Sequence, residues 1–336
     1  MKRHANVSIF VPHVGCPNQC SFCDQNRISG TARPPEPQAI RPVLEAGLKN
    51  LGDKAPEAQI AFFGGSFTAV NPDYRRALLA VAGDYIGGGG YGGIRISTRP
   101  DAIDEDILRE LKASGVTAIE LGVQSMDDEV LRANGRGHSA SHAVEASRLI
   151  RENGFSLGHQ MMTGLWQSTP EKDEETARQL AQLMPDTMRI YPTLVLQGTE
   201  LARLYEAGQY QPPTLAQAVA QCGNLLAFFE EKSIKVIRLG LHSEEALTDN
   251  LLAGPYHPAF RELCESSLML GRLRAELVRQ GINSGAITVA VAVGHTSKML
   301  GQKRCNAVTL AKEGYQLTVK EAVDMAPLAV RIAPQT

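Results

Sequence analysis

The stretch VPHVGCPNQCSFCDQNRISG, residues 11–30, gathers three cysteines within eight residues. Cys16, Cys20 and Cys23 follow a β-type run at 7–14, and no fourth cysteine lies near them. A structural zinc site takes four ligands, and so does an ordinary 4Fe–4S cluster. Three thiolates on a loop can instead each hold one iron of such a cluster and leave the fourth iron open. The spacing therefore predicts a metal centre with one open position.

The alternative from the residues alone is a structural zinc site with His13 as the fourth ligand. Zinc sites of this kind usually show two separated ligand pairs, which this loop lacks. The other cysteines, Cys222, Cys264 and Cys305, are scattered singly. Because Cys222 and Cys264 lie in helical patterns among apolar neighbours, we expect them to be buried packing residues.

Length and composition set the outer limits of the interpretation. The chain has 336 residues, 43% of them hydrophobic, which is enough for one large α/β barrel with a smaller appendage or for two domains. Lys and Arg (34) nearly balance Asp and Glu (36), so a nucleic-acid partner would need a local basic patch. No secretory signal and no apolar run long enough to cross a membrane is evident. We therefore expect a cytoplasmic protein with reduced thiols and no membrane partner.

Short β-type runs alternate with helical patterns from residue 7 to about 240. The predicted strands are 7–14, 59–65, 94–98, 118–124, 156–162 and 187–195, with helices such as 104–115, 139–154 and 171–184 between them. Helices that end near Gly or Pro and return to a strand are typical of βα units in a parallel sheet. The pattern predicts a partial (β/α)6 TIM-type barrel over residues 1–240 and a small α/β C-terminal extension over 241–336.

Polar and glycine residues stand where the predicted strands end. Active sites of parallel barrels lie at the carboxyl ends of the strands, so these residues are expected to share a cavity with the cysteine loop. They are Gly64, Gly65 and Ser66 after the second strand, Arg99 after the third, and Gln124 and Ser125 after the fourth, with Phe22 inside the loop itself. Paired glycines also make ordinary turns, Gln124 and Ser125 could merely satisfy backbone groups, and Arg99 could form a surface ion pair.

The run Cys16-Pro-Asn-Gln-Cys20-Ser-Phe-Cys23 resembles the signature of the radical S-adenosylmethionine (SAM) superfamily. The resemblance implies a partial barrel with a 4Fe–4S cluster and SAM as cofactors, SAM binding the open iron through its amino and carboxylate groups. It implies an external one-electron donor of the flavodoxin or ferredoxin type. It also implies that one electron splits SAM to a 5′-deoxyadenosyl radical, which abstracts hydrogen from a substrate. Gly64-Gly65-Ser66-Phe67 is similar to the family's motif that holds the SAM amine.

Residues 121–139 are similar to a block shared by Elongator catalytic subunits and oxygen-independent coproporphyrinogen oxidases. By that resemblance Gln124 would contact the ribose and Arg136 would pair with the SAM carboxylate. His138 is as well explained by packing as by catalysis. Many Elongator-type relatives have an acidic residue where Ser97 stands, which puts a SAM contact there in doubt.

The resemblance to the radical SAM part of Elongator catalytic subunits is the most extensive, with close matches at 136–166 and 188–210. Tyr191 lies where the sixth predicted strand meets its loop and could line the substrate end. A radical SAM enzyme that modifies a tRNA base is the leading hypothesis for the function. We expect the acetyltransferase domain of those subunits to be absent, with the residues from about 241 in its place. A radical SAM oxidase of a small molecule such as a tetrapyrrole, and an iron–sulfur or zinc protein without turnover, remain alternatives. The basic turn at 294–304 could hold a phosphate or be an ordinary solvated surface.

Overall fold

The computed structural model describes residues 5–12, 16, 19–24, 33–241 and 245–333. Seven parallel strands form one sheet in the order β1-β2-β3-β4-β5-β6-β8. They are β1 (Ala5–Val11), β2 (Ala58–Gly64), β3 (Ile94–Thr98), β4 (Val116–Gln124), β5 (Ser156–Thr163), β6 (Thr187–Pro192) and β8 (Lys235–Leu239). No pairing joins β8 to β1 among the described residues, so the sheet is an open half-barrel.

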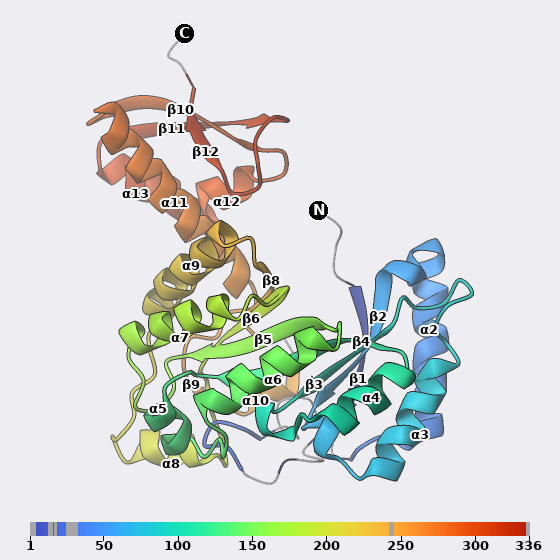
Figure 1. Ribbon diagram of the computed structural model, residues 1–336. Helices are drawn as coiled ribbons and strands as arrows, with labels where there is room; N and C mark the ends of the chain where they lie inside the picture. Colours follow the sequence, from blue (N-terminus) through green and yellow to red (C-terminus); the bar gives the residue numbers. More distant parts are fainter. Residues whose placement is uncertain (1–4, 13–15, 17–18, 25–32, 242–244, 334–336) are drawn as a thin grey trace.

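Helices cover the outer face of this sheet (Figure 1). They are α2 (Arg41–Leu51), α3 (Pro72–Gly83), α4 (Glu105–Ala113), α6 (Ala140–Glu152), α7 (Pro170–Gln182) and α9 (Leu215–Glu231). Side-chain oxygens of Asn71, Asp104, Thr169 and Thr214 accept amide hydrogen bonds at the starts of α3, α4, α7 and α9. Shorter elements near the strand ends are α5 (Asp128–Ala133), α8 (Glu200–Glu206), α10 (Glu245–Asp249) and the antiparallel pair β7 (Val195–Leu196) and β9 (Leu251–Ala253).

The predicted partial barrel is confirmed, with one strand more than the (β/α)6 arrangement expected. The seventh strand is β8, which pairs with β6 and extends the sheet. Alternation along the strands sorts their side chains between two faces. In β4, Ile119 and Leu121 are fully buried toward the helices, whereas Glu120 and Gly122 face the inside of the barrel and line a cavity there.

A small α/β extension follows, as predicted. It contains α11 (Phe260–Gln280), β10 (Gly285–Ala292), α12 (Thr296–Leu300), α13 (Cys305–Lys312), β11 (Tyr315–Ala322) and β12 (Val330–Ile332). Its sheet has the order β11-β10-β12, with β10 parallel to β11 and antiparallel to β12. Helix α11 packs against α9, and the small sheet lies beyond it, away from the barrel (Figure 1). The domain boundary at residue 240 stays a prediction.

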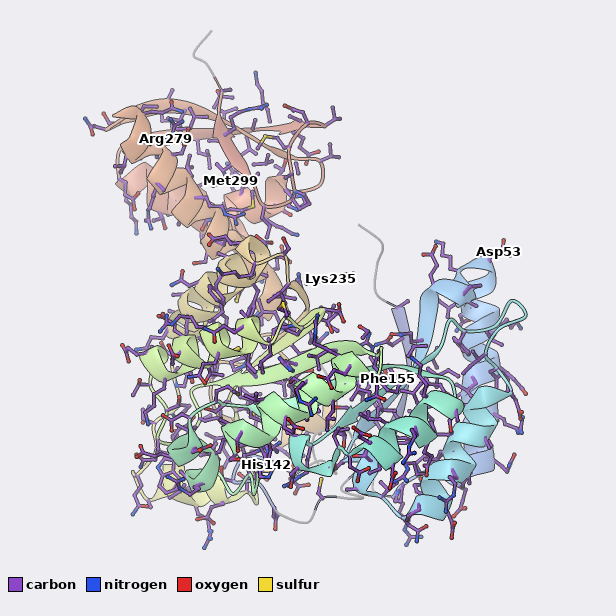
Figure 2. All side chains as sticks on the ribbon, viewed as in Figure 1. Asp53, His142, Phe155, Lys235, Arg279 and Met299 are labelled. Atoms are coloured by element: carbon purple, nitrogen blue, oxygen red, sulfur yellow. The ribbon has the colours of Figure 1, made fainter. Side chains whose placement is uncertain are left out.

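Side chains fill the layer between the barrel sheet and its outer helices, and Phe155 is one of them (Figure 2). The buried Cys222 and Cys264 also lie in this core, which confirms the packing role expected for them. Within the described residues, no helix combines the length and the apolar character that crossing a membrane requires.

His159 is a titratable residue buried between the barrel sheet and α6. His159, on β5, is 1% exposed, and its Nε2 lies 2.8 Å from Ser147 Oγ on α6. Its Nδ1 is buried and has no partner among the described residues. Burial lowers the pKa of His159 to about 3, because a charged imidazole would lose its hydration there. The native state therefore keeps this imidazole neutral at pH values where an unfolded chain would protonate it.

We expect His159 to make the protein less stable on mild acidification. An unfolded histidine takes up a proton near pH 6.5, and the native side chain does not until about pH 3. Stability therefore falls as the pH drops through this window, by about 1.4 kcal/mol per pH unit and about 2–3 kcal/mol between pH 6.5 and 4.5. Urea unfolding at both pH values should show this loss of stability in the native protein. In His159→Gln the loss should be smaller by the part that His159 contributes. Equal losses in the two proteins would contradict the assignment.

Candidate functional site

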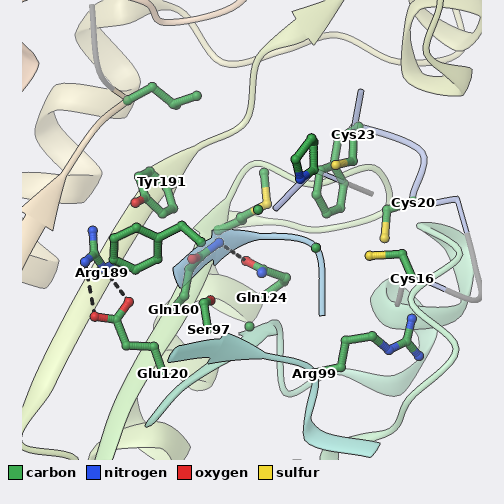
Figure 3. A pocket seen from close by; sticks show the side chains of 18 of the residues that line it. Cys16, Cys20, Cys23, Ser97, Arg99, Glu120, Gln124, Gln160, Arg189 and Tyr191 are labelled. Carbon is green, nitrogen blue, oxygen red and sulfur yellow. Dashed lines mark hydrogen bonds and ion pairs between the residues drawn. The ribbon is translucent and has the colours of Figure 1, made fainter. Parts of the chain in front are cut away.

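Cys16, Cys20 and Cys23 line one cavity of about 310 Å³ at the carboxyl ends of the barrel strands (Figure 3). Their loop is fastened to the end of α5, where the Ser21 amide donates to the Asn134 carbonyl (3.1 Å) and Ser21 Oγ donates to Asn134 Oδ1 (2.7 Å). The described part of the cysteine loop is therefore held against the barrel by buried hydrogen bonds.

The electrostatics of the three thiols favour a positively charged centre. Burial and then the neighbouring cysteines raise the pKa of Cys23 to about 12, and the same two causes raise the pKa of Cys16. Three thiolates this close are unfavourable unless cations hold them. Among the described residues, no three Cys, His, Asp or Glu side chains converge on a point as ligands of one ion would. A cluster in which each thiolate holds a separate iron fits this arrangement. His13, the zinc ligand considered above, lies outside the described residues.

Two buried arginines stand beside the cysteines and line the same cavity. Arg136 Nη1 donates to Cys20 Sγ (3.1 Å) and its Nη2 to the Gly122 carbonyl (2.5 Å), while its Nε is buried without a partner. Arg99 donates Nε and Nη2 to Asp101 (2.8 and 2.7 Å), and its Nη1 is likewise buried without a partner. Buried guanidinium nitrogens are nearly always hydrogen-bonded. The two orphaned donors therefore fit an anionic group such as the carboxylate of SAM.

In the glycine motif at the end of β2, the two glycines line the cavity and the serine packs outside it. Gly64 has φ +116°, and a Cβ there would lie 2.8 Å from the Val11 carbonyl oxygen. The Gly65 amide donates to that oxygen (2.7 Å), so the ends of β1 and β2 lie unusually close, and both glycines line the cavity. Ser66 is buried outside it, where its Oγ lies 2.9 Å from Thr98 Oγ1 and accepts from the Arg99 amide (3.2 Å).

At the end of β4 the side chain of Gln124 lines the cavity, whereas that of the next residue, Ser125, lies outside it. Gln124 has a left-handed backbone (φ 70°) at a register shift between β4 and β5, and its side chain lines the cavity. Strain of this kind costs on the order of 1 kcal/mol and concentrates at functional sites. Ser125 Oγ instead lies 3.3 Å from Thr176 Oγ1 on α7 and accepts from the Asp127 amide (3.1 Å). Ser125 thus supports the turn outside the cavity.

Of the other residues considered in the sequence, some line the cavity and others lie outside it. Phe22 and Tyr191 line the cavity and pack in one cluster with Met162. His138 is buried outside the cavity with Nε2 3.1 Å from the Val123 carbonyl, and burial lowers its pKa to about 4. In the extension, Lys298 is ion-paired with Glu265 at 2.7 Å.

Sequence reasoning missed a layer of charges across the barrel interior. Glu120 is 2% exposed and accepts from Arg95 Nη1 (3.0 Å) on β3 and from Arg189 Nε (2.6 Å) and Nη2 (3.1 Å) on β6. To reach Arg189 it passes over Gly158 on β5, where a Cβ would lie 2.8 Å from Glu120 Cγ. Phe63 lies against the guanidinium, 4.8 Å from ring centroid to Cζ. The signal was a charged residue inside each of three strands, with an apolar residue on either side of it in the sequence.

Comparison with models of protein families identifies the class of protein to which the chain belongs. The Radical SAM superfamily model matches residues 10–180, more than half of the chain, and a Radical_SAM C-terminal domain model matches residues 185–269. The chain belongs to the radical SAM superfamily. Membership implies a 4Fe–4S cluster and SAM as cofactors, which the three thiols and the two orphaned guanidinium donors fit.

Within the superfamily the chain is distantly similar to Elongator-type proteins. It is 26% identical over 239 residues to a tRNA uridine(34) acetyltransferase of Dehalococcoides mccartyi (61% of this chain, 52% of that protein). It is 30% identical over 197 residues to human Elongator complex protein 3 (52% and 36%). The structure of the archaeal Elp3 of Methanocaldococcus infernus matches with TM-score 0.61 at 20% identity, covering 84% of this chain and 64% of that one. The chain thus spans about half of the length of these curated relatives, or less.

Proposed function

We propose that this radical SAM enzyme cleaves SAM reductively at a cluster held by Cys16, Cys20 and Cys23, and abstracts hydrogen in order to modify a tRNA base. The observation that carries the proposal is the convergence of three thiols and two orphaned guanidinium groups in one cavity. When bound, the cluster and SAM supply a 5′-deoxyadenosyl radical. The chain's own side chains bind these groups, orient them and keep water out.

Each candidate site residue has a task in this proposal. Arg136 and Arg99 hold the SAM carboxylate with the donors that now lack partners. The carbonyl groups at Gly64 and Gly65 accept hydrogen bonds from the amino group of SAM, and Gln124 binds the ribose. Phe22 covers the cofactor, and Tyr191 stands at the substrate side. Ser66 and Ser125, whose hydroxyls are bonded outside the cavity, support the turns that carry these contacts.

The tRNA assignment draws on relatives named as tRNA uridine(34) acetyltransferases, among them those of Dehalococcoides mccartyi and Methanocaldococcus infernus. The chain covers 52% and 24% of these two proteins, so their acetyl transfer is not carried over. An external donor of the flavodoxin or ferredoxin type would deliver the electron.

Anaerobic reconstitution with iron and sulfide, followed by SAM and dithionite, should release 5′-deoxyadenosine. A fully loaded cluster that binds SAM and releases none contradicts the catalytic proposal. The same preparation should bind tRNA more weakly as the salt concentration rises, because phosphate contacts release counterions. No tRNA binding at low salt contradicts the RNA assignment and favours a small-molecule substrate such as a tetrapyrrole.

A further inference from the structure

The guanidinium group of Arg136 is a buried cation whose partners among the described residues include no carboxylate. Arg136 is 7% exposed, and its side chain bonds to Cys20 Sγ (3.1 Å) and to the Gly122 carbonyl (2.5 Å). The neighbouring Arg99 differs, because Asp101 accepts hydrogen bonds from two of its nitrogens. A buried charge without a counter-ion is costly. The cation at Arg136 therefore fits the negative charge that the cysteines and their cluster bring.

The segment that carries Arg136 is fastened directly to the cysteine loop. The amide and the hydroxyl of Ser21 both donate to oxygens of Asn134, at 3.1 and 2.7 Å. Gly135 has φ +63°, and a Cβ there would lie 3.1 Å from the Gln19 carbonyl oxygen, so the two segments touch through their backbones. The guanidinium donor and the sulfur that accepts from it are therefore carried by segments that are already held against each other.

We propose that the hydrogen bond from Arg136 to Cys20 raises the reduction potential of the cluster and so makes the cluster easier for its electron donor to reduce. A 4Fe–4S cluster held by three thiolates is an anion, and reduction adds a further negative charge. A positively charged donor at a ligand sulfur therefore stabilises the reduced form more than the oxidised form. The electron comes from the external donor, and Arg136 keeps its proton throughout. The inference rests on the proposed function, which uses Arg136 only for the carboxylate of SAM.

The surroundings of this contact make it strong. The two terminal nitrogens of Arg136 are bound by two different parts of the chain, Nη1 by the cysteine loop and Nη2 by Gly122 on β4, so the orientation of the guanidinium is fixed. The Gly122 carbonyl is neutral and leaves the positive charge uncompensated. Burial excludes the water that would screen this charge, and a hydrogen bond from a charged donor is stronger than one between neutral groups.

The test is a redox titration of the reconstituted protein without SAM and without oxygen, followed by the visible absorbance of the cluster and the electron paramagnetic resonance of its reduced form. Arg136→Leu removes both the hydrogen bond and the charge. We expect the equilibrium constant for reduction to fall about tenfold, which lowers the midpoint potential by about 59 mV for one electron. A change smaller than about threefold, or a change in the opposite direction, would overturn the inference.

Two further variants separate the hydrogen bond from the charge alone. Arg99→Leu removes an equal charge from the same cavity, but the bonds of Arg99 go to Asp101, so its loss should shift the potential less than Arg136→Leu does. Arg136→Lys keeps the charge and a donor, and it should recover part of the lost potential. Equal shifts in Arg99→Leu and Arg136→Leu would mean that the net charge of the cavity sets the potential, and the role of the bond would be refuted.

Iron and sulfide content is measured on every preparation before the titration. If Arg136→Leu takes up no cluster, Arg136→Gln, which keeps a donor without the charge, replaces it and should shift the potential in the same direction. The absence of a cluster from all three Arg136 variants would assign this side chain to cluster assembly and overturn the inference. Release of 5′-deoxyadenosine from the native protein is measured separately, so a failure of the redox role is distinguishable from a failure of the proposed function.

Discussion

Cys20→Ala is expected to abolish cluster assembly and to lower the release of 5′-deoxyadenosine by at least about a thousandfold. With three thiolates available for a cluster with four irons, the loss of one leaves two irons without protein ligands. Cys20 is also the buried thiol that accepts a hydrogen bond from Arg136 Nη1 (3.1 Å), so its loss removes a contact of that guanidinium as well. Cys16→Ala and Cys23→Ala should have the same effect. Iron and sulfide content after anaerobic reconstitution, together with product release, measures it.

The matched control is Cys305→Ala. Cys305 is exposed at the first position of α13 and does not line the cavity. Its removal should leave iron content, sulfide content and product release unchanged. A Cys20→Ala protein that still takes up a full complement of iron and sulfide would refute the ligand assignment, and with it the open iron on which the proposed chemistry depends.

The features that sequence predicted well are local ones. The cysteine spacing is contained in eight residues, and the strand pattern needs only windows of a few residues, so both could be found without knowing what contacts what. The same holds for glycines and polar residues at strand ends, since parallel strands present their carboxyl ends on one side. Gly64, Gly65, Arg99 and Gln124 indeed line one cavity. Arg136, which follows α5 and was named from the family resemblance, lines it as well.

The features that sequence missed depend on register or on side-chain direction. Ser66 and Ser125 directly follow cavity residues in the sequence, but the hydroxyl of each contacts a threonine of another strand or helix. The direction of a side chain in a turn does not follow from the sequence pattern. The pairing of Glu120 with Arg189 joins residues 69 apart and requires Gly158 on the strand between them. Strand β8 is short and mixes Lys and Arg with apolar residues, which weakens its pattern, and it is held by pairing with β6.

The charge layer also explains why the barrel interior can remain polar and still be well ordered. A buried carboxylate is tolerated when every oxygen has a donor, and both Glu120 oxygens have one. Arg95 completes the layer by donating Nε to Gln59 Oε1 (2.9 Å). Burial lowers the pKa of Arg95 despite these contacts, which shows that its guanidinium has lost hydration. The order of the barrel interior and the stability of the fold therefore rest on the same carboxylate.

Glu120→Leu should accordingly destabilise the protein by about 3–5 kcal/mol, the usual cost of breaking a buried ion pair from one side. The variant leaves Arg95, 3% exposed, and Arg189, 11% exposed at its side chain, without the carboxylate that both contact. The control is Glu145→Leu on α6, where the ion pair with Arg148 is half exposed and its loss should cost less than about 1 kcal/mol. Urea unfolding of the two variants and the native protein measures the difference. A loss in Glu120→Leu as small as in the control would mean that water solvates both guanidinium groups, and Glu120 would then neither hold the layer together nor position Arg189.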